Sequence, residues 1–530
     1  MTSAAASGAA GAGAKPGAVA AATSRPAAAA SAASAAPRAL VWLRNDLRTH
    51  DNPALAAAAA AVARGEASSV VPFVPFDPRN HGRSPLCGFP KTGAFRAKFR
   101  LEAAADLRRR LAALGSGLVV RPQPPEEIVA ELLLPLSSSG GAGAGSGGGG
   151  GAEAGGGIVF VSDEPFPEER EAVEAVREAL SLLSPQPVLR VVEPRGGAST
   201  LLHPDDLDFG SGMERLPDLF TAFRTAVERD WAVRPPVAAP ARGSLPLPRG
   251  DAGLAAEMTA AVLPLTRVED LGPLIRRACE SQGVAPYELA TPAEEGVRKL
   301  AVLDFEGGET AAYARLNHYL FGSKAASTYF ETRNGTIRCR EGEEAREQRE
   351  RERTREREGG RREKAKKTFK KTKSNTGMLG ADYSTKFSPW LAAGCLSPRI
   401  IADQLKKYEG LEGANKSTYW IVFELLWRDF FHFYARKHGS RVFAASGVSR
   451  KEGVAWRKGP AADAAFHAWT EGKTGRPLVD ANMRELAKTG FMSNRGRQNG
   501  TRSFFSSLEV ENGASKKEIL SLSILFSFSC

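Results

Sequence analysis

Short apolar runs and longer amphipathic stretches alternate along residues 39–195 of this 530-residue chain. An apolar run of about four to eight residues is typical of a buried strand, and apolar residues spaced three or four apart predict a helix. The apolar runs predict strands at 39–44, 70–76, 118–121, 158–161 and 188–192. The stretches between them predict helices at 53–64, 92–114 and 168–183. Regular alternation of strands and helices indicates a parallel α/β sheet.

The pattern changes after the fifth predicted strand. Residues 196–290 contain many prolines and read as a connection with some helices, whereas the helical period dominates from about residue 291. We therefore expect a fold class of α/β plus all-α, with a parallel α/β domain at 39–195 and a helical domain at 291–499. The glycine-, alanine- and serine-rich residues 137–157 predict a flexible loop within the first domain.

Two serine–proline pairs predict helix starts. In Ser388-Pro389, and again nine residues later, the serine is expected to cap the helix and the proline to occupy its first turn. Unpaired N–H groups at a helix N-terminus suit a phosphate. The residues before the first start add hydroxyls and a charge, and these are Ser384, Thr385 and Lys386. The alternative is a pair of ordinary capped helices.

A long aromatic helix is predicted at 417–437. Trp420, Glu424, Trp427 and Phe431 fall on one face at helical spacing. The other faces are also apolar, so much of this helix should be buried. A carboxylate there is costly unless it is paired or functional, and Arg428, one turn later, is a candidate partner. The turn and the helix together suit a phosphate-bearing aromatic cofactor, and the alternative is a core helix with one ion pair.

Several long motifs resemble one known family. A-L-V-W-L-R-N-D-L-R-T-H-D-N-P-A-L, which starts at Ala39, resembles the opening strand and turn of the photolyase/cryptochrome family. G-M-L-G-A-D-Y-S-T-K-F-S-P-W-L-A-A-G-C-L-S-P-R, F-E-L-L-W-R-D-F-F and V-D-A-N-M-R-E-L-A-K-T-G-F-M-S-N-R-G-R-Q-N are similar to its cryptochrome-DASH branch. The resemblance covers about 39–499, apart from inserted stretches. It implies an N-terminal Rossmann-like α/β antenna domain and a C-terminal helical FAD-binding domain.

The resemblance also implies roles for individual residues. The FAD diphosphate side would be held by Tyr329, Ser384, Thr385, Lys386, Phe387 and Ser388. The cavity between flavin and lesion would be lined by Glu424, Trp427 and Arg428. The flavin and its phosphates would be flanked by Asn494, Arg495 and Arg497. Of these, Glu424, Trp427 and Asn494 are the expected catalytic residues.

Two further roles follow from the same resemblance. Glu164 lies just after the fourth predicted strand, where ligands of open α/β sheets bind, and is a candidate contact for a folate antenna, 5,10-methenyltetrahydrofolate. Trp456 matches the outer member of the tryptophan relay through which the flavin is photoreduced. The alternatives are a solvated loop acid for Glu164 and surface packing for Trp456.

Three functions agree with the resemblance. The first is a light-driven carbon–carbon lyase that repairs cyclobutane pyrimidine dimers, favours single-stranded DNA and acts as a monomer. The second is a blue-light photoreceptor that signals to a partner without repair. The third is an inactive truncated isoform or the product of a faulty gene model.

Charge and cysteine usage narrow this picture only slightly. The net charge is +12, but residues 1–38 carry +3 and residues 338–373 carry +7, which leaves +2 for the rest. Basicity is therefore weak support for a DNA-binding surface on the folded body. The five cysteines are scattered without C-x-x-C, which suits a reducing compartment and argues against a metal site. No apolar run is long enough to cross a membrane.

Three segments depart from the family pattern. Residues 1–38 are rich in alanine and lack acids, which predicts a chloroplast or mitochondrial transit peptide or, alternatively, a disordered tail of a cytoplasmic or nuclear protein. Residues 335–376 interrupt the family pattern with alternating charges, and residues 500–530 read as a tail outside it. The resemblance implies a further helical section over the flavin, including two inner tryptophans, with no counterpart here. Both interruptions begin with Asn-Gly-Thr, so we expect translated intervening sequence, which transcript sequencing would test.

Overall fold

The computed structural model describes residues 37–84, 88–134, 156–193, 196–230, 232–289, 300–332, 380–444, 447–448 and 459–508. The alanine-rich start up to residue 36, the charged segment 335–376, Trp456 and the residues beyond 508 lie outside the described part. Most of residues 137–157, where a flexible loop is predicted, also lie outside it. The expectations for these segments remain predictions.

A five-stranded parallel sheet forms the first half of the molecule. Its strand order is β3-β2-β1-β4-β5. The strands are β1 (Arg38–Trp42), β2 (Ser69–Pro75), β3 (Val119–Arg121), β4 (Gly157–Ser162) and β5 (Val188–Val192). All five predicted strands are confirmed, because each apolar run is buried between two helical layers and has no need of alternating polar positions.

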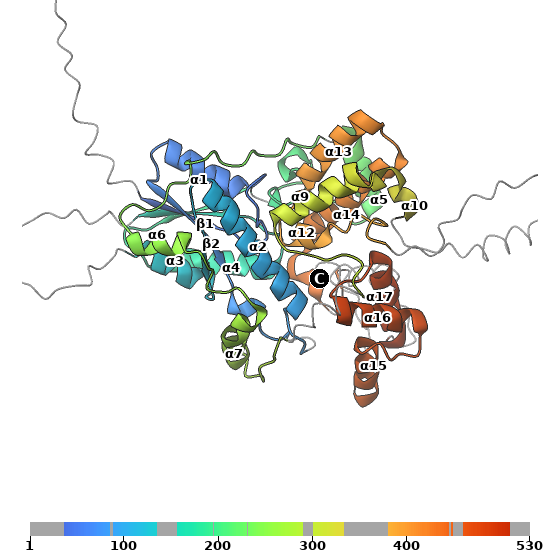
Figure 1. Cartoon of the computed structure of the whole chain (residues 1–530). Coiled ribbons are helices and arrows are strands. Elements are labelled where there is room, and N and C mark those ends of the chain that lie inside the picture. The colour runs from blue at the N-terminus through green and yellow to red at the C-terminus, as the bar shows by residue number, and fades with distance from the viewer. Residues whose placement is uncertain are drawn as a thin grey trace, which may run out of the picture.

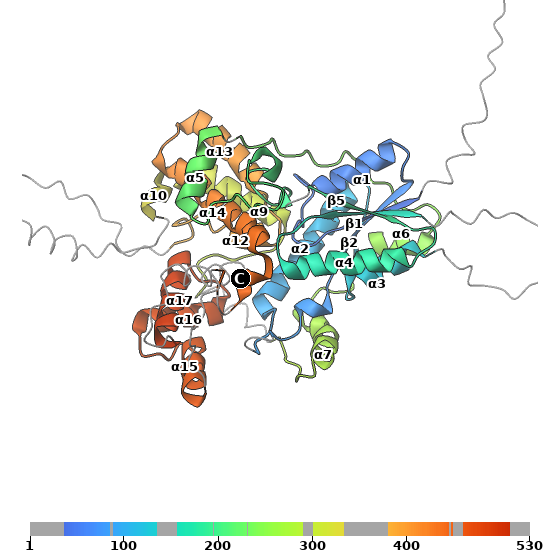
Figure 2. The ribbon, with the colours of Figure 1, turned by 180° about the vertical axis from the view of Figure 1, so that it is seen from behind.

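The sheet carries an apolar layer on each face. One layer joins Ala39 and Val41 of β1 to the helices α1 (Pro53–Ala63) and α2 (Ala94–Ala113). The opposite layer joins Leu40 and Trp42 of the same strand to α3 (Pro125–Leu133), α4 (Pro167–Ser181) and α6 (Ala252–Thr259). Figures 1 and 2 show these helices on the two sides of the sheet. The sequence pattern predicted α1, α2 and α4 but did not predict α3.

The connection and the second half are helical, as predicted. The connection contains α5 (Phe220–Asp230), α6 and α7 (Gly272–Ser281). The second half has a group around α14 and a group of three helices set below it in Figure 1. Its elements are α9 (Glu309–Asn317), the π-helical turn His318–Gly322, α10 (Tyr329–Thr332), α12 (Ser388–Ala392), α13 (Pro398–Glu412), α14 (Lys416–His438), α15 (Pro460–Thr470), α16 (Pro477–Thr489) and α17 (Asn494–Leu508).

Helix starts follow local capping chemistry. The side chain of Asn52 accepts a hydrogen bond from the Leu55 N–H and begins α1, and the Ser397 hydroxyl accepts from the Arg399 N–H and begins α13. The prediction that Ser388 caps α12 is wrong. Phe387 is the cap residue, it already has right-handed helical dihedrals, and Ser388 is the exposed first residue of the helix.

Within the described ranges, no helix is long and apolar enough to cross a membrane, and no group of three or more histidine, cysteine or acidic side chains could hold a metal ion. Two cysteines in these ranges, Cys279 and Cys395, are buried and free.

Candidate flavin site

A tight turn at residues 380–387 is held together by Arg315 of α9. The Arg315 guanidinium donates to the carbonyl oxygens of Thr385 (3.0 Å), Ala381 (2.8 Å) and Ser384 (3.1 Å), and it pairs with Asp382 at 2.9 Å. Because one planar guanidinium binds four acceptors, it fixes the path of the turn. The sequence analysis missed Arg315, since nothing local in the sequence links α9 to a turn about 65 residues later.

Lys386 is buried inside the same turn. Its Nζ donates to the carbonyl oxygens of Gly380 and Ala381, both at 3.0 Å, and lies 3.4 Å from the Ser384 hydroxyl. Its backbone is left-handed, with φ of 54°, and burial lowers its pKa to about 8. The described contacts of Lys386 therefore organise the turn itself, whereas the resemblance gives this lysine a role towards a phosphate.

An aromatic group connects Tyr329 to the turn. Tyr319, in the π-helical turn, packs edge-on against Tyr329 (6.4 Å between ring centroids) and against Phe387 (5.8 Å). All three rings are buried. Tyr319 was not predicted, yet it brings together two predicted residues that are far apart in the chain. Its hydroxyl is buried and has no hydrogen-bond partner among the described residues.

The predicted lesion-facing residues lie on α14, which begins with a capping box. The Asn415 side chain accepts from the N–H groups of Ser417 and Thr418, and the Thr418 hydroxyl accepts from the Asn415 N–H. Glu424, Trp427 and Arg428 are half-buried, whereas the face with Leu425, Leu426 and Asp429 is buried. The predicted stripe is therefore the less buried side of this helix.

The indole of Trp427 is stacked on a residue from the connection. Phe220, the first residue of α5, lies 3.6 Å from Trp427 between ring centroids, with an interplanar angle of 11°. Helices α5 and α14 are therefore joined by a face-to-face aromatic pair. Phe220 belongs to the motif L-P-D-L-F-T-A-F-R, but periodicity alone placed it only in a connecting helix.

Arg428 joins α14 to two neighbouring segments. Its guanidinium donates to the Ser199 carbonyl oxygen and lies 3.5 Å from the Leu391 carbonyl oxygen. Burial lowers its pKa. These contacts place Arg428 at the junction of α14, α12 and the 196–203 loop.

Glu164 is buried at the C-terminal end of the sheet. It follows β4 by two residues, and burial raises its pKa to about 8, against the opposing charges of Arg44 and Arg428. The neighbouring Asp163 forms an ion pair with Arg436 of α14. The antenna candidate therefore faces the C-terminal half of α14. The interpretation of Glu164 as an ordinary solvated loop acid is wrong, because the side chain is buried.

The three α17 candidates occupy a separate helical group. Asn494 is the exposed first residue of α17. Arg495 donates to the Gln498 side chain at 2.9 Å, and its buried Nε has no hydrogen-bond partner among the described residues. Arg497 donates to the Met492 carbonyl oxygen at 3.2 Å. A small core of Trp469, Val479, Met483 and Met492 supports this group, and Figure 2 shows it below α14 and α12.

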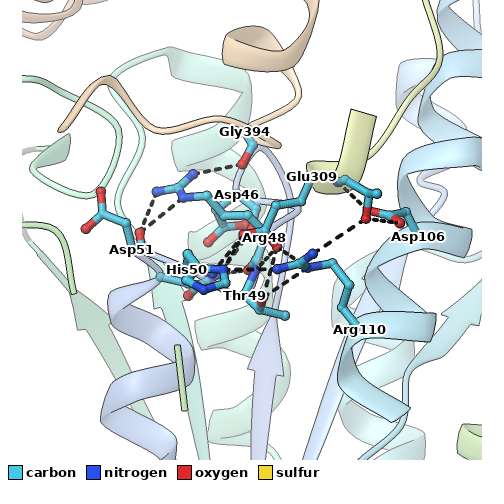
Figure 3. A network of polar contacts seen from close by, with 11 residues as sticks. Asp46, Arg48, Thr49, His50, Asp51, Asp106, Arg110, Glu309 and Gly394 are labelled. Carbon is cyan, nitrogen blue, oxygen red and sulfur yellow. Dashed lines mark hydrogen bonds and ion pairs between the residues drawn. The ribbon is translucent and has the colours of Figure 1, made fainter. Parts of the chain in front are cut away.

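A buried polar network holds the two halves together (Figure 3). Its centre is the loop after β1, residues 43–52. The Glu309 carboxylate accepts from the N–H (2.7 Å) and hydroxyl (2.9 Å) of Thr49 and from the His50 N–H (3.1 Å), and it pairs with Arg110 at 2.6 Å. Arg48 donates to the carbonyl oxygens of Asp51, Gly394 and Ala198. The polar residues of the R-N-D-L-R-T-H-D-N motif therefore dock the helical half onto the sheet.

The residues present fit FAD on structural grounds. A wound turn, three buried tyrosine and phenylalanine rings, and buried polar atoms of Tyr319 and Arg495 without described partners suit a cofactor with both phosphate and aromatic parts. Arg315 and Lys386 add positive charge near the turn. A diphosphate requires this kind of charge compensation.

Comparisons with known proteins agree with this geometry. Residues 39–138 match the family model of DNA photolyase, and residues 420–511 match the FAD binding domain of DNA photolyase. The second match and α17, which ends at Leu508, both extend beyond Asn499.

Individual relatives cover most of the chain. It is 40% identical to the cryptochrome DASH of Gloeobacter violaceus, over 87% of this chain and 70% of that protein. It is 38% identical to the cryptochrome DASH of Danio rerio, over 88% and 69% of the two chains. The crystal structure of a Synechocystis cryptochrome aligns with a TM-score of 0.62 at 32% identity, over 89% of this chain and 75% of that chain. A class III photolyase from Agrobacterium tumefaciens, 22% identical with a TM-score of 0.58, shares the fold.

The identities, the covered lengths and both family models agree with the α/β-plus-helical fold and with residues that fit FAD. The chain therefore belongs to the cryptochrome-DASH branch of the photolyase/cryptochrome family, whose members are blue-light flavoproteins that act as photoreceptors, in DNA repair, or in both.

Proposed function

We propose that this chain is a light-driven lyase that splits cyclobutane pyrimidine dimers and prefers single-stranded DNA. The observation that supports this most is the half-buried face of α14, where Glu424 and Trp427 lie one turn apart beside residues that fit FAD. A carboxyl group can hydrogen-bond a base edge, and an indole can stack on an unpaired base. An enzyme that unstacks its substrate spends less free energy on a lesion that is already single-stranded.

The residues of the chain would divide the work as follows. Tyr329 and the turn from Ser384 to Ser388 hold the diphosphate side of FAD, with Arg315 fixing the turn. Arg428 lines the cavity beside Glu424 and Trp427, whereas Asn494, Arg495 and Arg497 flank the flavin. Bound FAD supplies the light-driven electron that the dimer receives and returns. The protein positions the dimer and excludes water, and one monomer is sufficient for this.

Glu164 is proposed to contact a folate antenna. Its raised pKa means that the carboxyl group is largely protonated at neutral pH, so it can donate a hydrogen bond as well as accept one. Trp456, outside the described residues, is proposed as the outer electron-transfer residue on the basis of the resemblance alone.

The compartment and the domain limits are proposed on separate grounds. Relatives from Ostreococcus tauri, Oryza sativa and Arabidopsis thaliana carry the name cryptochrome DASH, chloroplastic/mitochondrial, and residues 1–38 here have a transit-peptide composition. We therefore propose organellar import. The proposed domains are 39–195 for the antenna, 196–290 for the connection and 291–499 for FAD, with 335–376 as an insertion and 500–530 as a tail.

The test uses the full chain loaded with FAD. An absorption spectrum should show flavin bands that bleach under blue light with a reductant, and the protein should split dimers in a single-stranded oligonucleotide. Glu424→Gln should reduce splitting about 10-fold or more, whereas Glu412→Gln, in an exposed ion pair at the end of α13, should leave it unchanged. Photoreduction without splitting would instead support the signalling photoreceptor. A colourless protein would support the inactive isoform.

A further inference from the structure

On the basis of the proposed repair function, we infer that Phe220 is a positioning residue: it fixes the plane of the Trp427 indole and leaves one indole face for an unstacked pyrimidine. Phe220 lies in the connection, outside the residues to which the resemblance gives a role. Its ring is the partner of Trp427 that is closest to parallel among the described residues, at 3.6 Å and 11°. Phe430 and Phe431 contact Trp427 at 84° and 32°.

The Phe220 ring is itself held from several sides. Phe423 and Phe430, at positions 427 − 4 and 427 + 3 of α14, contact it edge-on at 5.3 Å and 5.8 Å. Phe223, one turn later on α5, lies 6.1 Å away. Edge-to-face contacts on both sides of a stacked pair restrict rotation of the central ring. Since Phe220 is only 7% exposed, this ring cannot leave without opening the α5–α14 contact.

The far end of α5 is attached to the same helix. The Tyr419 hydroxyl of α14 donates to Glu228 at 2.5 Å, and Arg224 lies 5.7 Å from the ring centroid of Phe423. Helix α5 is therefore held on α14 at its start by the Phe220 stack and one helix length later by Tyr419. The indole plane of Trp427 is fixed by the docking of a whole helix.

This arrangement has a consequence for recognition. One face of Trp427 is covered by Phe220, and the residue is only half-buried, so a base can stack only on the other face. Because the indole is held before the ligand arrives, binding loses less side-chain entropy. A leucine at position 220 would keep apolar volume but would remove the flat support and allow the indole to tilt.

The decisive variants are Phe220→Leu and Phe220→Tyr, with Phe209→Leu as the matched control. Phe209 is a buried ring of the same segment, and it contacts Phe223 at 5.9 Å. The probe is a single-stranded oligothymidylate with one cyclobutane dimer, added in the dark to the FAD-loaded full chain. We expect Phe220→Leu to raise Kd roughly 3- to 10-fold, with the splitting yield at saturating DNA unchanged. Phe220→Tyr should bind like the wild type, and so should Phe209→Leu.

A second readout needs neither DNA nor light. The Phe220–Trp427 stack should contribute to near-ultraviolet circular dichroism, and this contribution should disappear in Phe220→Leu and persist in Phe209→Leu. Equal Kd values for Phe220→Leu and the wild type, or equal losses in the two leucine variants, would overturn the positioning role alone. Failure of the wild type to bind the dimer would instead overturn the proposed repair function, and the positioning role with it.

Discussion

Asp51 and Arg399 form a buried ion pair with two contacts between the loop after β1 and the start of α13. The Arg399 Nη2 lies 2.8 Å from Asp51 Oδ1, and its Nε donates to Oδ2 at 3.0 Å. Neither residue is more than 2% exposed. Asp51 also accepts hydrogen bonds from the Ser397 hydroxyl and the Val237 N–H. One carboxylate therefore connects the sheet half, the connection and the helical half.

Loss of this pair should destabilise the whole protein. Asp51→Ala leaves the Arg399 guanidinium buried without its counter-charge, so we expect the free energy of unfolding to fall by about 3–5 kcal/mol. Urea unfolding measures this change. Glu174→Ala, which removes an exposed ion pair with Arg177 on α4, should cost less than about 0.5 kcal/mol. Similar losses in both variants would show that the buried pair does not hold the halves together.

Gly394 should be irreplaceable for a steric reason. Its φ is +70°, and an added Cβ would lie 1.7 Å from the Asn45 carbonyl oxygen. Gly413 also has positive φ (+86°), but its Cβ would meet nothing within 4 Å. We expect Gly413→Ala to cost about 1 kcal/mol through backbone strain alone, and Gly394→Ala to cost several times more or to prevent folding. Thermal unfolding compares the two, and equal melting temperatures would argue against the close approach.

The ionisation of Glu164 should make stability depend on pH. The carboxyl group has a pKa of about 8 when folded, which is above its unfolded value of about 4.3. Between these values the folded state binds more protons, so this group's stabilisation is complete below the unfolded pKa and is lost as pH rises towards 8. The loss is at most about 1.4 kcal/mol per pH unit.

Glu164→Gln should therefore flatten the fall in stability between pH 5 and pH 8. Burial also raises the pKa of Asp429, to about 7, so part of the slope remains. Urea unfolding of wild type and variant at both pH values measures the difference. Glu171→Gln, on the exposed side of α4, is the control and should leave the slope unchanged. Parallel curves for Glu164→Gln and the wild type would contradict the raised pKa.

Arg315 should control flavin affinity through the 380–387 turn. Arg315→Lys keeps the charge but cannot bind three carbonyl oxygens and Asp382 together. We expect the dissociation constant for FAD to rise about 10-fold or more, because the turn must then be ordered when FAD binds. Flavin release on dilution, followed by fluorescence, measures it. The exposed Arg177→Lys on α4 is the control, and unchanged flavin retention in Arg315→Lys would separate the turn from the cofactor.

The sequence by itself determined the elements and the family. The five apolar runs became the five strands because buried parallel strands need no polar alternation. Asn52 and Ser397 marked helix starts because capping depends only on neighbouring residues. The aromatic helix 417–437 became α14 with its limits one residue away at each end.

The tertiary structure alone decided what the marked residues touch. Ser388 lost its predicted capping role because Phe387, with its ring buried beside Tyr319, already has helical dihedrals. Lys386 contacts its own turn, and Phe220 meets Trp427 across more than two hundred residues of sequence. Side-chain contacts between distant segments depend on how helices dock, and no local period or capping rule contains that information.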